Sequence, residues 1–584
     1  MILKTIWSHI RIRRRKQLGL LMILMLLASV SEVISIGAIL PFLAVLSNPT
    51  IIFDHELAQP FIQLLELTEP GQLILPFTIL ISLSAIITGS IRILMIWAQT
   101  RLANAIGADL SYQIYKRTLF QPYPIHVARN SSEMIDGIAS KANQVVGGFI
   151  MPGLNVISVF MMMTTILAAL VVLDPIVVTS MIAGFSLIYA LIARFTKKRL
   201  VLNSELMSKK SVLVIKALQE GLGGIRDVLI DGSQATYIKI FRSADLPIRH
   251  ARANNTILSL SPRYVIEALG MVLIAWLAYS LGDGEGDFIG TLPILGAIAI
   301  GAQRMLPMLQ LAYSSWSSFR GAQVILQDAI ALLEQPLPNY AEGPTIEAIP
   351  FQQAITMEKV SFRYGVNTPW VLRDLSLEIP KGSRIGIIGT TGSGKSTLLD
   401  IIMGLLHPSE GKIAIDGMEV TDQNHRGWQS HISHIPQAIY LSDATIAENI
   451  AFGVPIEKIN HQQVQFAAKQ AQIAETIETW EQGYETTVGE RGVRLSGGQR
   501  QRIGIARALY KQADVIIFDE ATSALDNETE RAVMEAIDNI QEEITILMVA
   551  HRLTTLKSCN LIIELEDGKI KRSGSYLEIV RYES

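Results

Sequence analysis

Cysteine and charge are both scarce in this sequence, and each shortage narrows the class of protein. A single cysteine, Cys559, stands among 584 residues, so no disulfide can form within the chain. Charged residues make up only 18% of the chain and hydrophobic residues 49%, whereas ordinary soluble domains are about 25% charged. The net charge of −3 is too near zero to indicate a nucleic-acid partner. These values favour a membrane protein without disulfide bonds.

Long apolar runs are absent after about residue 320 but frequent before it. Six runs reach the roughly 20 residues that a membrane-spanning helix needs, and they cover about 17–46, 72–100, 144–173, 175–195, 258–281 and 288–313. The basic start of the first run would also suit a secretory signal peptide, but its apolar core is too long and no small-residue cleavage site follows. We therefore predict a transmembrane domain of six helices.

A segment rich in proline and acid, Glu334 to Pro350, follows the last apolar run. Such a composition is typical of an exposed linker. We predict a transmembrane domain over residues 1–333, a linker over 334–350 and a second domain over 351–584.

Lysine and arginine are missing from three connections between the predicted spans, at 48–71, at Asp174 and at 283–287. Basic residues gather at the opposite ends of the spans, in the N-terminal run at 11–16 and in the run TKKR at 196–199. Because these residues are retained on the cytoplasmic side of a membrane, both termini and the second domain are expected in the cytoplasm.

Two long connections on the cytoplasmic side have the composition of helices that continue beyond the membrane. At about 1.5 Å per residue, a 30-residue arm of this kind reaches about 45 Å. The breaks at Gln121 to Pro124 (QPYP) and Gly221 to Gly224 (GLGG) end the two arms. The breaks are either simple turns between helices or contacts for the second domain, and an ATPase in that domain favours contacts.

The first motif with a chemical function in the second domain is a phosphate-binding loop. Gly389 to Ser396 (GTTGSGKS) fits the P-loop pattern, between a strand-like run and a helical one. Lys395 should meet the β- and γ-phosphates of ATP, and Ser396 should ligate Mg²⁺. The residues expected to contact the nucleotide here are Gly389, Thr390, Thr391, Gly392, Ser393, Gly394, Lys395, Ser396 and Thr397.

An apolar strand, VIIF, ends in Asp519 and Glu520. An acid at this place is suited to hold the metal ion, so we assign Asp519 to Mg²⁺. Glu520 should face the γ-phosphate, where a carboxylate can orient or deprotonate the attacking water. Alternatively, Glu520 only adds negative charge around the metal.

The run LSGGQ at Leu495 to Gln499 narrows the class further, because the domain here resembles ABC ATPases. The resemblance covers about residues 355–575. It implies that Tyr364 stacks on adenine, and that Gln437 senses the γ-phosphate through Mg²⁺ and the attacking water. It also implies that His551, after the strand ITILMVA, contacts the γ-phosphate; the alternative is a core histidine. The remaining residues that the resemblance assigns to nucleotide binding are Ser496, Gly497, Gly498, Gln499 and Asp526.

In ABC ATPases the signature of one subunit closes over ATP held by the other. The resemblance therefore implies a dimer, and a homodimer is expected because this chain carries every part; a heterodimer remains open. Because the α/β P-loop domain is fused to six predicted spans, the resemblance implies that the chain is one half of a type I ABC exporter. ATP and Mg²⁺ are the cofactors that it implies.

Three membrane segments are similar to those of bacterial lipid-linked oligosaccharide flippases: Glu32 to Pro41, 261–270 and 303–307. The similarity implies ATP-driven flipping of a lipid-linked oligosaccharide or polysaccharide precursor across the bacterial cytoplasmic membrane. A drug or lipid exporter is the alternative, followed by an ATP-gated channel or regulator.

Three arginines, Arg92, Arg263 and Arg304, lie about 24–30 Å from the outward ends of their spans, counted at about 1.5 Å per residue. They either snorkel to the cytoplasmic boundary, with Arg263 paired to Glu267, or form a positive layer for a phosphate or pyrophosphate head group. We expect this layer to bind the substrate.

Overall fold

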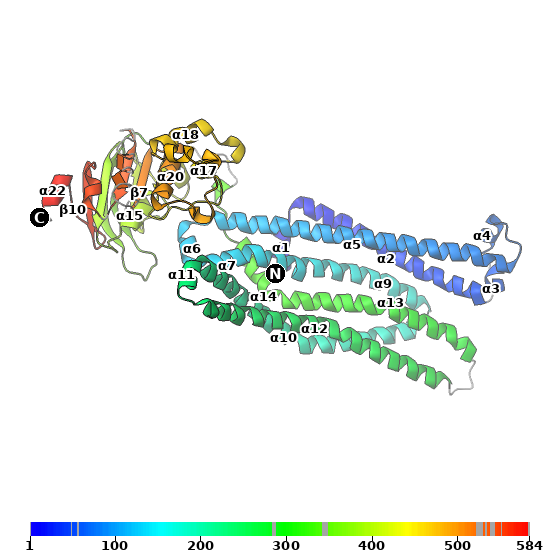
Figure 1. Ribbon diagram of the computed structural model, residues 1–584. Helices are drawn as coiled ribbons and strands as arrows, with labels where there is room; N and C mark the ends of the chain where they lie inside the picture. Colours follow the sequence, from blue (N-terminus) through cyan, green and yellow to red (C-terminus); the bar gives the residue numbers. More distant parts are fainter. Residues whose placement is uncertain are drawn as a thin grey trace. The chain divides into compact units, whose positions relative to one another are not determined.

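The computed structural model describes the chain except for residues 1, 48, 55–57, 174, 283–287, 342–348, 521–529, 532–533, 536, 538–542, 551 and 582–584. The chain forms two compact units (Figure 1). The first unit comprises residues 1–121 and 129–337, and the second comprises residues 122–128 and 338–584. A short stretch between two membrane helices therefore belongs to the C-terminal unit.

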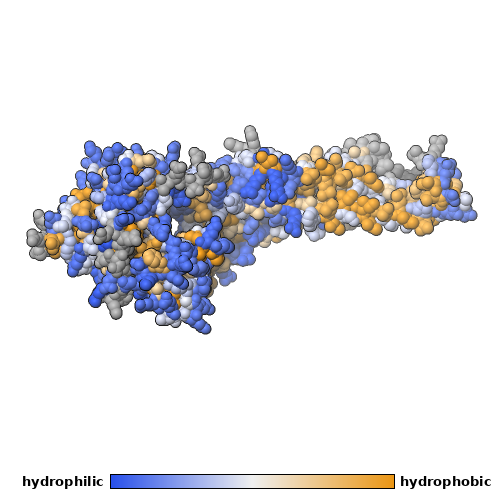
Figure 2. All heavy atoms as spheres, turned by 90° about the horizontal axis from the view of Figure 1, so that it is seen from above, coloured by the Kyte–Doolittle hydropathy of each residue, from blue (hydrophilic) through white to orange (hydrophobic). Residues whose placement is uncertain are grey.

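Six long helices build the first unit (Figure 1). They are α2 (Ile12–Ser47), α5 (Ile74–Leu119), α9 (Met151–Leu173), α10 (Pro175–Gly223), α12 (Gln234–Gly282) and α13 (Phe288–Gly321). Each contains one of the predicted spans or most of it. Three stretches of the described residues are long and apolar enough to cross a membrane, namely Ile12–Ser35, Pro70–Leu119 and Ser131–Ala168. On the face that it displays, Figure 2 shows an apolar stretch of surface on the long helices with hydrophilic surface at both of its ends.

The third predicted span differs from a single α-helix. It begins in α8 (Ala142–Val145), passes through a π-helical turn at Val146–Ile150 and continues as α9. Gly148 lies in this turn, and a Cβ atom added to it would stand 2.4 Å from the Cβ of Ala322. A glycine is needed where two helices approach so closely, because any side chain would force them apart.

The two long connections that the sequence predicted to continue as helices are helical. α5 runs without interruption from Ile74 to Leu119, and α10 from Pro175 to Gly223. The first break forms the short helix α6 (Tyr123–Ala128), which clusters with the second unit. After the second break, α11 (Ile225–Ile230) leads into α12.

Two sheets form the second unit. A six-stranded sheet has the order β10-β9-β3-β8-β7-β6, and a four-stranded sheet has the order β2-β1-β4-β5. The strands are β1 (Ala354–Phe362), β2 (Leu372–Pro380), β3 (Arg384–Gly389), β4 (Glu410–Ile415), β5 (Met418–Glu419), β6 (Ile432–Ile435), β7 (Val515–Asp519), β8 (Thr545–Val549), β9 (Leu561–Glu566) and β10 (Lys569–Gly574). In the larger sheet β9, β3, β8, β7 and β6 are parallel neighbours, and β10 is antiparallel to β9.

Two hydrophobic cores hold the second unit together. Helix α15 (Lys395–Ile402) packs in one core with the sheets, where Trp428 is fully buried and donates through its Nε1 to Ile402 O at 2.7 Å. Helices α17 (Ile446–Ile450), α18 (His461–Gln470) and α20 (Gly497–Tyr510) surround the other core. The P-loop helix and the helix after LSGGQ thus belong to different cores.

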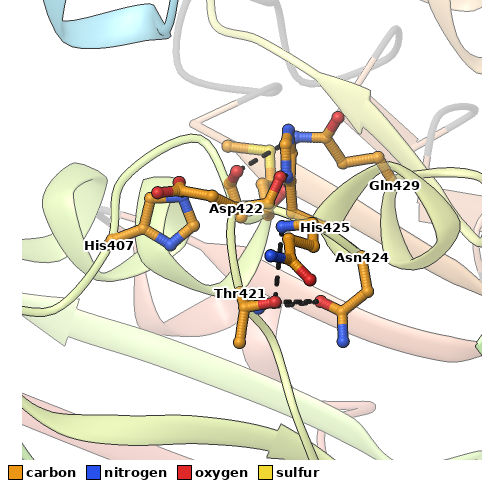
Figure 3. A network of polar contacts seen from close by, with 9 residues as sticks. His407, Thr421, Asp422, Asn424, His425 and Gln429 are labelled. Carbon is orange, nitrogen blue, oxygen red and sulfur yellow. Dashed lines mark hydrogen bonds and ion pairs between the residues drawn. The ribbon is translucent and has the colours of Figure 1, made fainter. Parts of the chain in front are cut away.

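The linker contacts a polar cluster of the second unit. Asp422 lies between two histidines: its carboxylate accepts from His407 Nε2 at 2.7 Å, and its carbonyl oxygen is 3.0 Å from His425 Nδ1 (Figure 3). The ring of Tyr340, within the predicted linker 334–350, meets His425 edge-on with 5.5 Å between centroids. The Arg426 guanidinium lies 5.7 Å from the Tyr340 ring centroid. These contacts fix the point where the chain enters the unit.

Candidate functional site

The order of the larger sheet brings together motifs that are far apart in the sequence. The parallel strands β3, β8, β7 and β6 are consecutive neighbours, so their carboxyl ends lie along one edge. Gly389 ends β3, and Asp519 ends β7 opposite Val549 of β8. Gln437 follows β6 by two residues. Ligands of parallel α/β sheets bind at this edge, where Gly389, Asp519 and Gln437 lie.

Lys395 is buried at the centre of this edge, with 7% of its surface exposed. Its ammonium donates to Gly389 O at 2.8 Å and to Thr390 O at 3.1 Å. Both hydrogen bonds go to uncharged carbonyl oxygens, and a buried positive charge is stabilised when an anion lies beside it. The loop is therefore suited to an anion such as a triphosphate.

The loop around Lys395 has the backbone geometry that phosphate binding requires. Gly392 and Gly394 have φ values of 87° and 100°, a region that side chains other than glycine rarely adopt. A Cβ atom on Gly389 would stand 2.3 Å from Leu565 O. Ser393 Oγ is buried without a hydrogen-bond partner among the described residues. A free hydroxyl and close-packed glycines fit a nucleotide phosphate held by the loop.

Glu520 and Gln437 meet at the same edge. Gln437 Nε2 donates to Glu520 Oε2 at 3.1 Å. Glu520 has a φ of 51°, a left-handed conformation that is uncommon for a residue other than glycine. Its N–H donates to Val549 O at 3.1 Å and ties it to the end of β8. The structure thus brings together two of the three residues predicted to be catalytic.

Two carboxyl groups near the P-loop have raised pKa values. Burial, followed by the charge of Glu520, raises the pKa of Asp519, while Lys395 lowers it. Burial and the charge of Asp519 raise the pKa of Asp400, in helix α15, to about 6. Such a concentration of acidic groups suits a site for a divalent cation, in which Asp519 and Ser396 would be ligands.

Tyr364 lies beside the P-loop helix. Its hydroxyl is 3.2 Å from Thr397 Oγ1, and its ring meets Phe362 edge-on with 5.0 Å between centroids. The tyrosine is 57% exposed, so a ring face is free for stacking on a base. Burial and the nearby groups of Asp400 and Tyr364 also raise the pKa of Tyr123, which starts α6. Tyr123 therefore lies near the P-loop helix, within the same compact unit.

The LSGGQ run forms the start of helix α20. Ser496 is the N-cap, whose hydroxyl accepts from Gln499 N at 3.2 Å, and Gln499 Oε1 accepts from Ser496 N at 2.8 Å. Gly497 has no neighbouring atom within 4 Å of an added Cβ. The backbone N–H groups at this helix start are accessible to an anion. Asp526, with the rest of 521–529, and His551 lie outside the described residues.

In the membrane unit, Arg92 has a partner that was not predicted. Its Nη1 lies 3.5 Å from Glu32 Oε2 across the α2–α5 interface. Glu32 is fully buried, whereas 41% of the Arg92 side chain is exposed. One turn away, Thr88 Oγ1 donates to Ser31 O at 3.0 Å. The ion pair lowers the cost of a charge at membrane depth and still leaves donors of Arg92 accessible.

Of the other two predicted arginines, the structure describes the side chain of Arg263 but not that of Arg304. Arg263 Nε is 3.9 Å from Glu267 Oε2, one helical turn away, and both side chains are nearly half exposed. This is the pairing that the sequence offered as one explanation. Arg304 lies in α13, and its side chain is outside the described part of the chain.

Comparisons with known proteins agree with this geometry. The ABC transporter family model matches residues 372–523. An ATP-dependent lipid A-core flippase of Chromohalobacter salexigens is 33% identical over 397 residues, which cover 67% of this chain and 67% of the flippase. The flippase of the same name from Pasteurella multocida is 28% identical over 489 residues, 80% of either chain.

A mouse mitochondrial relative, ATP-binding cassette sub-family B member 10, is 41% identical over 252 residues; the match spans 43% of this chain and only 35% of that protein. Among solved structures, a bacterial Atm1-family ABC exporter with ATP bound matches 98% of this chain and 96% of its own. Its TM-score is 0.79 at 24% identity. This likeness confirms the predicted fold class, a six-helix exporter domain joined to an α/β ATPase.

We expect Arg92→Gln to destabilise the protein more than Glu32→Gln. Removing Arg92 leaves a fully buried carboxylate without its arginine, a change that costs about 3–5 kcal/mol in buried ion pairs. Removing Glu32 leaves a guanidinium that is already 41% exposed and can turn toward water. Thermal unfolding of both variants in the same lipid nanodiscs measures the difference. Equal losses of melting temperature would contradict the assigned asymmetry, and the double Gln variant should recover part of the loss.

We expect Asp400→Asn to stabilise the protein above about pH 6. The folded pKa of about 6 exceeds the unfolded value of 3.8, so the native state binds the proton more tightly. Wild-type stability therefore falls as the pH rises between these values and stays lower above them. The variant should melt on the order of 1–3 °C higher at pH 8 and show no gain near pH 4. Asp443→Asn, at an exposed carboxylate, is the control, and a gain that does not change with pH would refute the assignment.

Proposed function

Since this chain belongs to the ABC transporter family and is an ATP-driven flippase or exporter, we propose a lipid-linked oligosaccharide or polysaccharide precursor as its cargo, moved across the bacterial cytoplasmic membrane. Relatives named lipid A-core flippases support an amphiphilic cargo. The observation that carries the proposal is that Arg92 and Arg263 keep 41% and 49% of their side chains exposed although each has a carboxylate nearby.

Guanidinium groups placed in this way suit a phosphate or pyrophosphate head group. An arginine can bind phosphate oxygens through two parallel N–H donors. Because each of the two paired arginines uses only one nitrogen in its ion pair, further donors remain for the cargo. We propose that Arg304 completes the layer with them. A broad exporter of drugs without phosphate groups would need no such donors, so the arginines favour a phosphorylated cargo over that alternative.

For ATP hydrolysis we assign roles to the residues at the sheet edge. Lys395 and the loop N–H groups bind the phosphates, and Tyr364 stacks on adenine. Mg²⁺, held by Ser396, Asp519 and Gln437, would neutralise charge on the phosphates. Glu520 orients the attacking water or takes its proton. The 3.1 Å hydrogen bond from Gln437 supports this role because it holds the carboxylate in place. His551 would contact the γ-phosphate, and Asp526 would act across the subunit boundary.

We propose that the active form is a homodimer. Helix α20, which carries the signature, packs on α17 and α18, whereas the P-loop helix α15 belongs to the other core. The signature therefore suits the P-loop of a second copy better than its own. Native mass spectrometry of the purified protein should give twice the chain mass of 64.3 kDa. A stable ATPase-active monomer, or an obligate complex with a different chain, would rule this out.

We expect Glu520→Gln to retain ATP binding and to reduce hydrolysis by about 10²-fold or more, because an amide cannot accept the proton of the attacking water. Nucleotide binding is measured by fluorescence with a labelled ATP analogue, and hydrolysis by phosphate release. Lys395→Ala is the contrasting variant, because it should lose binding as well. If Glu520→Gln hydrolysed ATP at the wild-type rate, Glu520 would not be the residue that accepts the proton of the attacking water.

We expect replacement of both Arg263 and Arg304 by alanine to reduce transport of a pyrophosphate-bearing lipid at least tenfold while basal ATP hydrolysis stays within about twofold. The measurement is flipping of a fluorescent polyprenyl-pyrophosphate glycan in proteoliposomes, with phosphate release from the same sample. A neutral fluorescent lipid serves as the control substrate. Unchanged transport of the pyrophosphate lipid by the variant would show that both arginines only snorkel and do not bind the cargo. If the wild-type protein transported neither lipid, the proposed cargo would be wrong.

A further inference from the structure

Helix α10 carries a dense group of cations where its apolar part ends. Arg194, Lys197, Lys198 and Arg199 are all exposed. No carboxylate lies within ion-pair distance of any of the four in the described part of the chain. Four positive charges within six residues repel one another, so this arrangement costs free energy unless an anion compensates it.

The other basic run at this side of the membrane is used within the protein. Arg14 Nε is 2.9 Å from Asp109 Oδ2, and Arg11 Nη1 is 3.7 Å from the other oxygen of that carboxylate. Arg15 donates to Ile10 O at 3.0 Å and to Trp7 O at 2.7 Å, at the end of helix α1 (Ile2–His9). The two runs look alike in sequence, but only the run on α10 is free of such contacts among the described residues.

The orientation of α10 is fixed by contacts on its opposite face. Thr196 is buried, and its hydroxyl is 3.1 Å from the Tyr313 hydroxyl. Two turns further, Asn203 Nδ2 donates to Asn255 Oδ1 at 2.7 Å. Leu200, between them, is fully buried. The helix cannot rotate to bury its cations without losing these bonds.

An exposed apolar ridge leads up to the cations. Leu187, Leu191 and Phe195, spaced one turn apart, are 63%, 48% and 77% exposed. Phe195 is followed within two residues by Lys197, so the ridge changes from apolar to cationic over one helical turn. Figure 2 shows the same change from apolar to hydrophilic surface for the helices on the face that it displays. A phospholipid has this profile, with acyl chains beside its charged head group.

We propose that Arg194, Lys197, Lys198 and Arg199 form a binding site for the head groups of anionic phospholipids in the cytoplasmic leaflet. The acyl chains lie along Leu187, Leu191 and Phe195. Basic residues next to a membrane attract anionic lipids electrostatically, and arginine and lysine both donate to phosphate oxygens. The lipid stays bound as a component of the annulus and is not the cargo, so the site is separate from the arginine layer and does not depend on it.

The test measures phosphatidylglycerol binding to the full-length protein by native mass spectrometry. Lys197→Gln combined with Lys198→Gln should weaken binding of the first lipids roughly tenfold or more, because each lysine near the surface contributes to the attraction. The matched control is Lys239→Gln combined with Arg242→Gln, two exposed cations on the cytoplasmic arm of α12. The control removes the same charge and should bind phosphatidylglycerol as wild type does.

Three further outcomes decide the proposal. Phosphatidylcholine should bind wild type more weakly than phosphatidylglycerol, and added salt should weaken phosphatidylglycerol binding to wild type. Lys197→Arg combined with Lys198→Arg should retain binding if the Gln variant is too unstable to measure. Equal lipid affinities of the Gln variant and the control, or equal affinities of wild type for both lipids, would overturn the proposal. Displacement by inorganic phosphate at the same concentration would also overturn it, because the site would then serve a soluble anion.

Discussion

The parallel pairing of β3, β8, β7 and β6 is the constraint on which the nucleotide site depends. Strand pairing aligns Asp519 with Val549 and Ile387 with Val549, so the ends of three neighbouring strands share one level. Lys395 of the P-loop and the Glu520–Gln437 pair can then lie along one edge of the sheet although these residues span more than a hundred positions of the sequence. A shift of one residue in this register would turn the side chain of Asp519 to the opposite face of the sheet.

The membrane unit obeys a different constraint, the cost of charge in an apolar medium. Glu32 is buried completely, and Arg92 reaches it from the neighbouring helix. The same cost acts at the end of α10, where no described carboxylate compensates the cations and they remain exposed. The two arrangements differ in how the positive charge is compensated: Arg92 is paired within the helix bundle, whereas the cations of α10 are directed outward.

The sequence alone predicted those parts of the structure that depend on interactions between residues close together in the chain. Six apolar runs predict the six long helices because main-chain groups within a bilayer must be paired within the helix. The P-loop could be predicted because its glycines, lysine and serine are consecutive. The same holds for Asp519 and Glu520, which end an apolar strand. Roles that depend on Asp526 and His551 remain predictions, since both lie outside the described residues.

What the sequence did not reveal depends on contacts between distant segments. Glu32 could be recognised only as part of a family resemblance, because its partner lies on another helix and the packing register brings the two together. The π-helical turn at Val146–Ile150 contains Gly148, which closely approaches Ala322, a residue far away in the sequence. The sequence favoured a contact of the first break with the second domain, but it did not reveal that Tyr123 and Asp400 are the residues brought together.

That helix has a mechanical consequence. α5 has 46 residues without a break, and its interior contains no proline after Pro76, which stands in its first turn. At about 1.5 Å per residue it is a stiff rod of about 69 Å, so a tilt of about 10° at its cytoplasmic end displaces its outer end by about 12 Å. Helix α6 begins four residues after the end of this rod and clusters with the ATPase domain. A tilt at one end of α5 is thereby magnified along its length, and a single unbroken run of main-chain hydrogen bonds is the lever.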